Sequence, residues 1–240
     1  MSKKIAITGA SSDIGKAIIT KMKNNQFHFI IHTTSKETGF QEFLMNLGIQ
    51  FDIYVADFTK PDQLANFCSE LKENDVLINV AGSTKTDLLP MLTDDDINTM
   101  IDVNIRALIK ICQAAIPYMS SKRRGCIVNI SSIAASKGNR GQTVYAGTKG
   151  FVESFSRSLA AEYGSRGIRV NCVAPGAINA GSLKQILNYA PEEIKNNLLS
   201  KRLGTPNDVA NLTVFLCSEE AGFINGQVIK TDGGYLKGLT

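Results

Sequence analysis

Short apolar runs alternate along the chain with longer stretches in which apolar residues recur every three or four positions. The short runs are rich in β-branched residues and end at Gly, Asp, Ser or Pro, which is typical of strands. These predicted strands lie at 4–8, 28–32, 51–55, 75–80, 126–131, 168–174 and 227–232. Helices are predicted between them at 14–24, 36–47, 61–72, 93–120, 143–163 and 206–218.

This alternation favours a parallel sheet of about seven strands with helices on both faces, in one doubly wound α/β domain over residues 1–240. Three predicted helices have a residue suited to the N-cap at their start: Thr59, Thr93 and Thr205. The segment 177–202 interrupts the alternation. Because loops beyond the carboxyl ends of parallel strands bind ligands, we expect this segment to be a substrate lid; the alternative is a surface insertion without such a role.

The composition is that of an ordinary globular protein, with 43% hydrophobic and 20% charged residues. The formal net charge of +4 is mild, and the basic residues are scattered apart from a cluster at 122–124. No apolar stretch approaches the roughly 18 to 20 residues that a membrane-spanning helix needs. We therefore expect neither nucleic acid nor a membrane as a partner.

Five cysteines lie far apart and form no CxxC pattern. Such a set predicts reduced thiols rather than a disulfide framework or a zinc site, and with them a cytoplasmic location. The two histidines, His28 and His32, lie on one predicted strand without the pattern of a metal site. We expect them to occupy packing or edge positions, and we expect no catalytic metal.

The first predicted strand is followed by the turn TGASSDIG, residues 8–15. A glycine-punctuated turn between a strand and a helix lets backbone N–H groups approach a pyrophosphate at the helix N-terminus. The turn therefore predicts a Rossmann-like dinucleotide site; the alternative is a tight turn that binds nothing. The residues expected to contact the cofactor here are Gly9, Ser11, Ser12, Asp13, Ile14 and Gly15.

The spacing of this turn resembles the GxxxGxG motif of the short-chain dehydrogenase/reductase family, with Asp13 in place of the middle glycine. NVAG at 79–82 and the dipeptide Pro175-Gly176 are similar to two further motifs of that family. The resemblance implies a Rossmann-like fold and a nicotinamide cofactor. The further cofactor contacts that it implies are Asp57, Phe58, Val80, Ala81, Gly82, Tyr145, Lys149, Pro175, Gly176 and Ile178.

Four more residues match the family's catalytic set: Asn104 in DVNIRA, Ser132 in NISS, and Tyr145 with Lys149 in a YxxxK pattern. A lone YxxxK only places two side chains on one helix face, but here all four members occur in the family's order. The resemblance implies that Tyr145 protonates the carbonyl oxygen and that Ser132 donates a second hydrogen bond to it. Lys149 would hold the cofactor ribose and favour the phenolate, and Asn104 would bind a water that resupplies the proton.

The residues after the second predicted strand bear on which nicotinamide cofactor binds. An acid at that position binds the ribose hydroxyls of NAD and repels the extra phosphate of NADP. In this chain Thr33, Thr34, Ser35 and Lys36 come before the first acid, Glu37. The sequence therefore favours NADPH over NADH.

Within the family, the segments 81–92 and 202–211 are most similar to 3-oxoacyl-(acyl-carrier-protein) reductases. Arg123 and Arg166 fall where those reductases carry arginines that dock the acidic carrier protein; the alternative is ordinary solvated charge. The resemblance implies NADPH-dependent reduction of a 3-oxoacyl thioester on acyl carrier protein, in fatty-acid or related secondary-metabolite synthesis. It also implies a homotetramer, with a dimer as the alternative.

Two residues depart from the family pattern near the cofactor. Val80 replaces an asparagine, and Ala180 stands where many relatives have a threonine at the nicotinamide end. These changes either adapt the pocket or weaken cofactor binding. Two other functions stay open: a dehydrogenase of a free sugar, polyol or steroid, and a non-catalytic nucleotide-binding subunit, against which the intact catalytic set argues.

Overall fold

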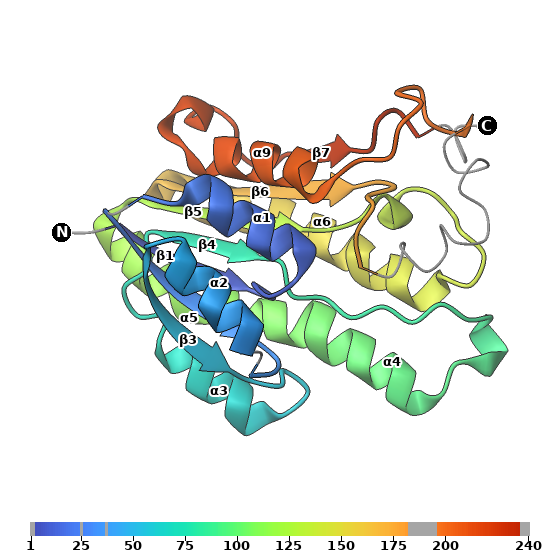
Figure 1. Ribbon diagram of the computed structural model, residues 1–240, viewed down its shortest axis with the longest axis horizontal. Helices are drawn as coiled ribbons and strands as arrows, with labels where there is room; N and C mark the ends of the chain where they lie inside the picture. Colours follow the sequence, from blue (N-terminus) through green and yellow to red (C-terminus); the bar gives the residue numbers. More distant parts are fainter. Residues whose placement is uncertain (1–2, 25, 37, 182–195, 236–240) are drawn as a thin grey trace.

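The computed structural model describes residues 3–24, 26–36, 38–181 and 196–235. At its centre is a seven-stranded sheet in the order β3-β2-β1-β4-β5-β6-β7, and each neighbouring pair is parallel (Figure 1). The strands are β1 (Lys3–Thr8), β2 (Phe27–Thr33), β3 (Gln50–Val55), β4 (Val76–Asn79), β5 (Gly125–Ile130), β6 (Ile168–Pro175) and β7 (Val228–Thr231). The predicted Rossmann-like α/β architecture is confirmed.

Helices cover both faces of this sheet, with α1, α2 and α9 on one face and α3, α5 and α6 on the other (Figure 1). Their bounds are α1 (Asp13–Met22), α2 (Thr38–Asn46), α3 (Pro61–Ser69), α4 (Asp94–Ile101), α5 (Ala107–Lys122), α6 (Thr143–Tyr163) and α9 (Pro206–Cys217). Each face has its own apolar cluster. Because a central strand contacts both clusters, β5 is buried at every position, as a doubly covered parallel strand should be.

The sequence placed most element boundaries within three residues of those observed. Two predicted caps are confirmed as complete capping boxes, Thr93 with Asp96 on α4 and Thr205 with Asp208 on α9. The third prediction was wrong, because Lys60 rather than Thr59 precedes α3. The Thr59 hydroxyl donates instead to Asp57 Oδ1 at 2.8 Å.

The stretch predicted as one helix over 93–120 is helical from Asp94 onward, but it is not one regular α-helix. It consists of α4, a π-helical turn η2 (Asp102–Arg106) and α5. A π turn takes one residue more than an α turn, so it rotates the side chains before it relative to those after it. Asn104 lies within this turn, which turns its side chain toward the sheet and α6.

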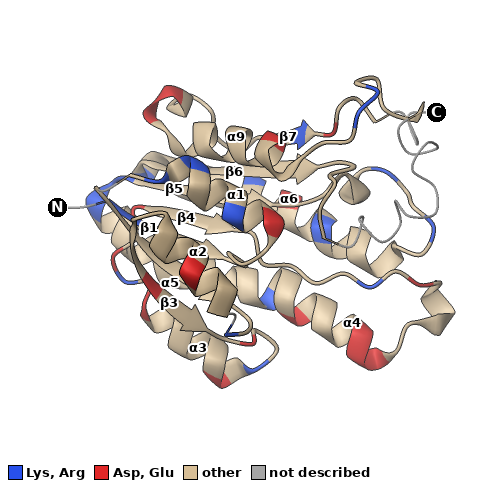
Figure 2. Ribbon diagram, viewed as in Figure 1, with Lys and Arg blue, Asp and Glu red and all other residues tan. Residues whose placement is uncertain are grey.

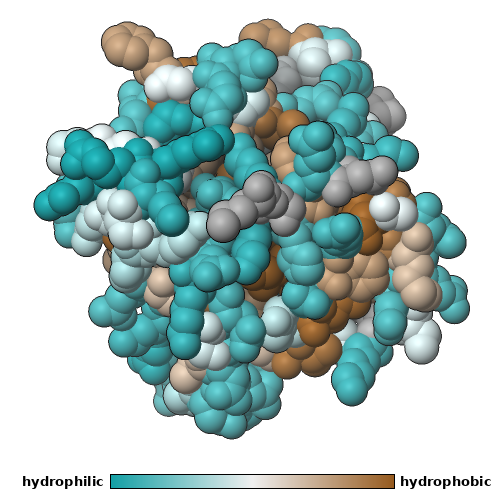
Figure 3. Space-filling view, turned by 90° about the vertical axis from the view of Figure 1, so that its left-hand side faces the viewer, coloured by the Kyte–Doolittle hydropathy of each residue, from teal (hydrophilic) through white to brown (hydrophobic). Residues whose placement is uncertain are grey.

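Lys and Arg are spread over helices and loops and do not gather on one face (Figure 2). The face at the amino ends of the strands is mostly hydrophilic, with an apolar area to one side (Figure 3). Within the described part of the chain, no helix is both long and apolar enough to cross a membrane. Open parallel α/β sheets bind their ligands beyond the carboxyl ends of the strands, at the end opposite to the face in Figure 3.

Candidate active site

A cleft of about 410 Å³ opens at the carboxyl ends of the central strands. Its walls come from the turn after β1, the segment after β4, the β5–α6 connection and the end of β6. The predicted site residues that line it are Ser12, Asp13, Ile14, Val80, Gly82, Ser132, Tyr145, Lys149, Pro175, Gly176 and Ile178. Of the predicted lid, residues 182–195 lie outside the described residues, as does Glu37.

Asn104 is anchored behind this cleft by three hydrogen bonds and is only 2% exposed. Its Oδ1 accepts the Ser83 N–H at 2.7 Å, while Nδ2 donates to the Ser83 carbonyl at 2.8 Å and to Thr148 Oγ1 at 2.9 Å. The Thr148 hydroxyl donates in turn to the Tyr145 carbonyl at 2.8 Å. Thr148, which the sequence analysis did not single out, therefore ties the π turn to the helix that carries Tyr145 and Lys149.

Lys149 is buried, and its ammonium is held in a defined place. Its Nζ donates to the Ile130 carbonyl at 2.9 Å and lies 5.8 Å from the centre of the Tyr145 ring. A Cβ built on Gly82 would lie 3.2 Å from this Nζ and 3.4 Å from Asn104 Oδ1. A side chain at position 82 would therefore crowd both the Lys149 ammonium and the Asn104 amide oxygen.

Ser132 lies two residues after the end of β5 and lines the same cleft as Tyr145. Its Oγ accepts the Ala134 N–H at 3.2 Å, which orients the hydroxyl. A hydroxyl that accepts in this way can still donate its own proton. Of the predicted catalytic set, Ser132, Tyr145 and Lys149 therefore line the cleft, and Asn104 supports it from behind.

The turn after β1 forms a close cradle at the other end of the cleft. Gly9 has φ +63, and a Cβ there would lie 2.7 Å from the Ala81 Cα; one on Gly15 would lie 2.6 Å from the Ala10 carbonyl. Ser12 caps α1, because its Oγ accepts the Gly15 N–H at 3.1 Å. This glycine cradle at a helix N-terminus fits the phosphates of a dinucleotide, and Tyr145 and Lys149 line the same cleft.

Asp13 occupies the first turn of α1 and lines the cleft. Its Oδ2 accepts the Gly181 N–H at 3.4 Å and so contacts the first residues of the predicted lid. Where the family motif has a glycine, this chain therefore has a link between the glycine turn and the segment that follows β6.

His32 is a residue whose role the sequence did not reveal. It is buried, as predicted for a packing position, but Nδ1 also accepts the Gly9 N–H at 3.1 Å and Nε2 donates to the Ala56 carbonyl at 2.8 Å. Burial lowers the pKa of His32 from 6.5 to about 4, so the ring is neutral near pH 7. The Phe58 ring stacks on it, with 3.8 Å between the two ring centroids, and is itself buried.

The residues predicted to choose between NADPH and NADH divide into two groups. Thr33 is buried, with its hydroxyl 3.0 Å from Ser11 Oγ, so this predicted cofactor residue and Ser11 support the turn from inside. Thr34 and Ser35 are exposed at the end of β2. Asp57, at the end of β3, accepts two hydrogen bonds from Thr59, which lower the pKa of its carboxyl.

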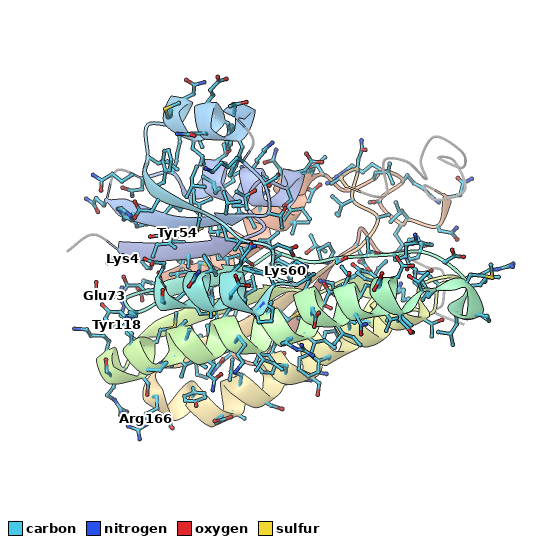
Figure 4. The ribbon with its side chains drawn as sticks, turned by 90° about the horizontal axis from the view of Figure 1, so that it is seen from below. Lys4, Tyr54, Lys60, Glu73, Tyr118 and Arg166 are labelled. Atoms are coloured by element: carbon cyan, nitrogen blue, oxygen red, sulfur yellow. The ribbon has the colours of Figure 1, made fainter. Side chains whose placement is uncertain are left out.

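Arg123 and Arg166 lie side by side at the other end of the molecule. Arg123 Nη2 donates to the Ser165 carbonyl at 2.9 Å, and both side chains are exposed. Arg166 lies at the same end as Lys4 in β1, the amino end of the sheet (Figure 4). Tyr145 and Tyr163 are separated by eighteen residues of α6, about 27 Å at 1.5 Å per residue, so the arginine pair is remote from the cleft of its own chain.

All five cysteines are free. Among residues 3–24, 26–36, 38–181 and 196–235, no group of three or more His, Cys, Asp or Glu side chains is arranged to hold a metal ion. His28 lies near the amino end of β2, between β1 and β3, with its Nε2 2.7 Å from Asp52 Oδ2.

Comparison with known proteins gives the same picture. Residues 9–236 match the family model described as Enoyl-(Acyl carrier protein) reductase. The 3-oxoacyl-(acyl-carrier-protein) reductase of Chlamydia muridarum is 34% identical over 241 residues, which cover 98% of this chain and 97% of that protein.

Two solved structures extend the comparison. ElxO with NADP bound has a TM-score of 0.88 and 31% identity, over 98% of this chain and 99% of that one. A putative NAD(P)-dependent gluconate 5-dehydrogenase from Beutenbergia cavernae has a TM-score of 0.91 and 28% identity, over 98% and 96%. With its sheet order, its glycine turn and its catalytic motif residues, the chain belongs to the short-chain dehydrogenase/reductase family.

Proposed function

We propose that this protein is an NADPH-dependent reductase of 3-oxoacyl thioesters carried on acyl carrier protein, acting in fatty-acid or related secondary-metabolite synthesis. The observation that carries the proposal is the presence of Ser132, Tyr145 and Lys149 on one cleft with the glycine cradle. Similarity to a 3-oxoacyl-(acyl-carrier-protein) reductase over 98% of the chain supports the substrate class.

In this proposal a bound nicotinamide supplies a hydride to the carbonyl carbon of the substrate. Negative charge then develops on the carbonyl oxygen, and the hydroxyls of Ser132 and Tyr145 donate hydrogen bonds to it. Tyr145 gives up its proton to complete the alcohol. The Lys149 ammonium, held by the Ile130 carbonyl beside the Tyr145 ring, stabilises the phenolate that remains.

The proton returns to Tyr145 through Lys149 and a water bound near Asn104. Both protons of Asn104 Nδ2 are already donated, to Ser83 and Thr148. That water must therefore donate to the second lone pair of Oδ1 or bind the backbone of the π turn. The three hydrogen bonds of the Asn104 side chain keep the amide in one orientation behind the cleft.

The preference for NADPH rests on the exposed Thr34 and Ser35, which offer hydroxyls and no carboxylate to the ribose phosphate. NADP in the related ElxO structure supports it. The proposal includes a cytoplasmic enzyme, in keeping with five free thiols, and a homotetramer or dimer. It also assigns carrier docking to Arg123 and Arg166, whose exposed guanidinium groups complement an acidic carrier.

The test is oxidation of NADPH and NADH by the purified protein with acetoacetyl thioester, beside Tyr145→Phe. We expect turnover with NADPH and a loss of at least about 100-fold in the variant, since it lacks the acid. Tyr145→Phe should still bind NADPH, because it keeps the ring and Lys149.

The alternative substrate class is a free polyhydroxy compound, favoured by the similarity to the putative gluconate 5-dehydrogenase. A protein that oxidises a sugar acid with NADP and reduces no thioester would support that alternative and refute the thioester proposal. A protein that binds NADPH and turns over neither would indicate a non-catalytic role.

A further inference from the structure

Lys137 is a buried lysine in the connection between β5 and α6, five residues after Ser132. It is only 4% exposed, and lysines are almost never this deeply buried unless they are paired. Its backbone N–H donates to the Ile133 carbonyl at 2.9 Å, which fixes the residue in its loop. The proposed reduction gives this side chain no role.

The ammonium of Lys137 faces the segment that follows β7. Its Nζ lies 4.0 Å from Asp232 Oδ2 and 5.1 Å from the centre of the Tyr235 ring. Asp232 is itself mostly buried, and its Oδ1 accepts the Gly234 N–H at 3.1 Å. One cation therefore contacts both a carboxylate and an aromatic face of the same short segment, which we call the tail, residues 232–235.

The tail is packed closely against the end of β6. The Gly176 N–H donates to the Thr231 carbonyl at 3.0 Å, and a Cβ on Gly176 would lie 2.4 Å from the Asp232 Cβ. At its far end, Tyr235 lines the same cleft as Ser132 and Tyr145. Lys137 and Gly176 thus hold the tail from two sides, and the Tyr235 ring forms part of the cleft wall.

We propose that Lys137 is a positioning residue that holds the Tyr235 ring as the wall against which the acyl chain of the substrate packs. The inference rests on the proposed function for the identity of that substrate. Apolar residues of the same loop, Ile133 and Ala134, line the cleft together with Tyr235, which suits an alkyl chain. Lys137 itself is not among the residues lining the cleft, so its loss should affect acyl binding rather than hydride transfer.

The test compares steady-state constants for a 3-oxooctanoyl thioester. Lys137→Met keeps the length of the side chain and removes the charge, so we expect KM to rise at least about fivefold with kcat within about threefold. The NADPH Kd, measured by fluorescence, should stay within about twofold. Lys137→Arg keeps the cation and should keep most of the wild-type affinity for the thioester.

A double variant separates this role from a general loss of structure. Tyr235→Ala should raise KM as Lys137→Met does, and the two together should raise it no further than the larger single effect, because both remove the same wall. The proposal would be overturned if the KM effects of the two single variants multiply in the double variant, or if Lys137→Met leaves KM unchanged. It would also be overturned if the NADPH Kd changes as much as KM does. Asp232→Asn, which weakens the same contact, provides a second route if Lys137→Met does not fold.

Hydrogen exchange of the tail in the free protein provides a readout that needs no substrate. Amides of residues 232–235 should exchange faster in Lys137→Met than in the wild type and at wild-type rates in Tyr235→Phe. If the wild type reduces no thioester yet the tail loosens, the substrate assignment fails and the positioning role stands. If the tail exchanges equally in all variants, the positioning role fails whatever the substrate.

Discussion

His32 connects the glycine turn to the interior through two ring nitrogens, one accepting from Gly9 and one donating to Ala56. Only the neutral ring can do both, since a protonated ring has two donors and no acceptor. Protonation of Nδ1 would therefore set two buried N–H groups, of His32 and of Gly9, against each other. The order of the proposed phosphate cradle depends in this way on a single protonation state.

This dependence predicts a loss of stability in mild acid. The pKa of His32 is about 4 in the folded protein and about 6.5 in the unfolded chain, so the unfolded state takes up the proton first as pH falls. The contribution is complete above pH 6.5 and is lost as pH falls toward 4. By linkage, about 2 kcal/mol of the free energy of unfolding should be lost between pH 7.5 and pH 5.

Urea unfolding at the two pH values measures this loss. His32→Phe keeps an aromatic ring against Phe58 and should be less stable at pH 7.5, but it should lose about 2 kcal/mol less than the wild type on going to pH 5. Thr213→Val, which changes a buried residue of α9 that does not titrate, is the control and should keep the wild-type pH dependence. Equal pH dependence in His32→Phe and the wild type would contradict the assignment.

At the scale of elements, a hydrogen bond at Thr148 joins the π turn to α6. Thr148 accepts from Asn104 Nδ2 and donates to the Tyr145 carbonyl, and it is 3% exposed. The π turn presents Asn104 to this hydroxyl, and the same helix carries Lys149 one residue later. π turns within α-helices are frequent at functional sites, because the extra residue gives a side chain a direction that a regular helix would not.

Thr148→Val should therefore lower kcat while leaving the fold intact. Valine has nearly the same shape but leaves a buried proton of Asn104 without an acceptor, which costs about 1–3 kcal/mol and allows the amide to turn. We expect kcat to fall about tenfold. Thr213→Val in α9 is the matched control, because Thr213 is also buried but donates only to the Val209 carbonyl of its own helix. Equal kcat values in the two variants would refute the role of Thr148.

At the scale of the whole molecule, the arginine pair and the cleft lie at opposite ends of α6. The double variant Arg123→Glu with Arg166→Glu reverses both charges. Its KM for carrier-bound 3-oxoacyl substrate should rise at least about tenfold, because the new carboxylates repel the acidic carrier protein. KM for free acetoacetyl thioester should not change. The effect should shrink as salt is raised, since exposed charges are screened.

Lys21→Glu with Lys23→Glu provides the control, because it changes the net charge by the same amount at another exposed site. Kinetics with carrier-bound and free thioester distinguish docking from bulk charge. An equal rise in KM for both double variants would show that net charge, not a docking surface, attracts the carrier.

Much of this protein follows from its sequence alone. Strands and helices could be placed because their apolar periods are local. The glycine turn could be recognised because its backbone requires glycine: φ is +63 at Gly9, and the chain approaches Gly15 too closely for a side chain. Ser132, Tyr145 and Lys149 could be named because they match the motifs of a known family, and the parallel sheet brings them to one cleft. The resemblance to a family supplied their chemical roles.

The tertiary structure decided the rest. Thr148 and Lys137 lie in ordinary sequence, and His32 looked like a packing residue, because what distinguishes each is a partner far along the chain: Asn104, Asp232 with Tyr235, and Gly9. The π turn escaped prediction because one extra residue barely alters a helical period but redirects Asn104. Local sequence patterns determine which helices and strands form. The hydrogen bonds and ion pairs that order a site depend on which of these elements come into contact, and tertiary packing determines those contacts.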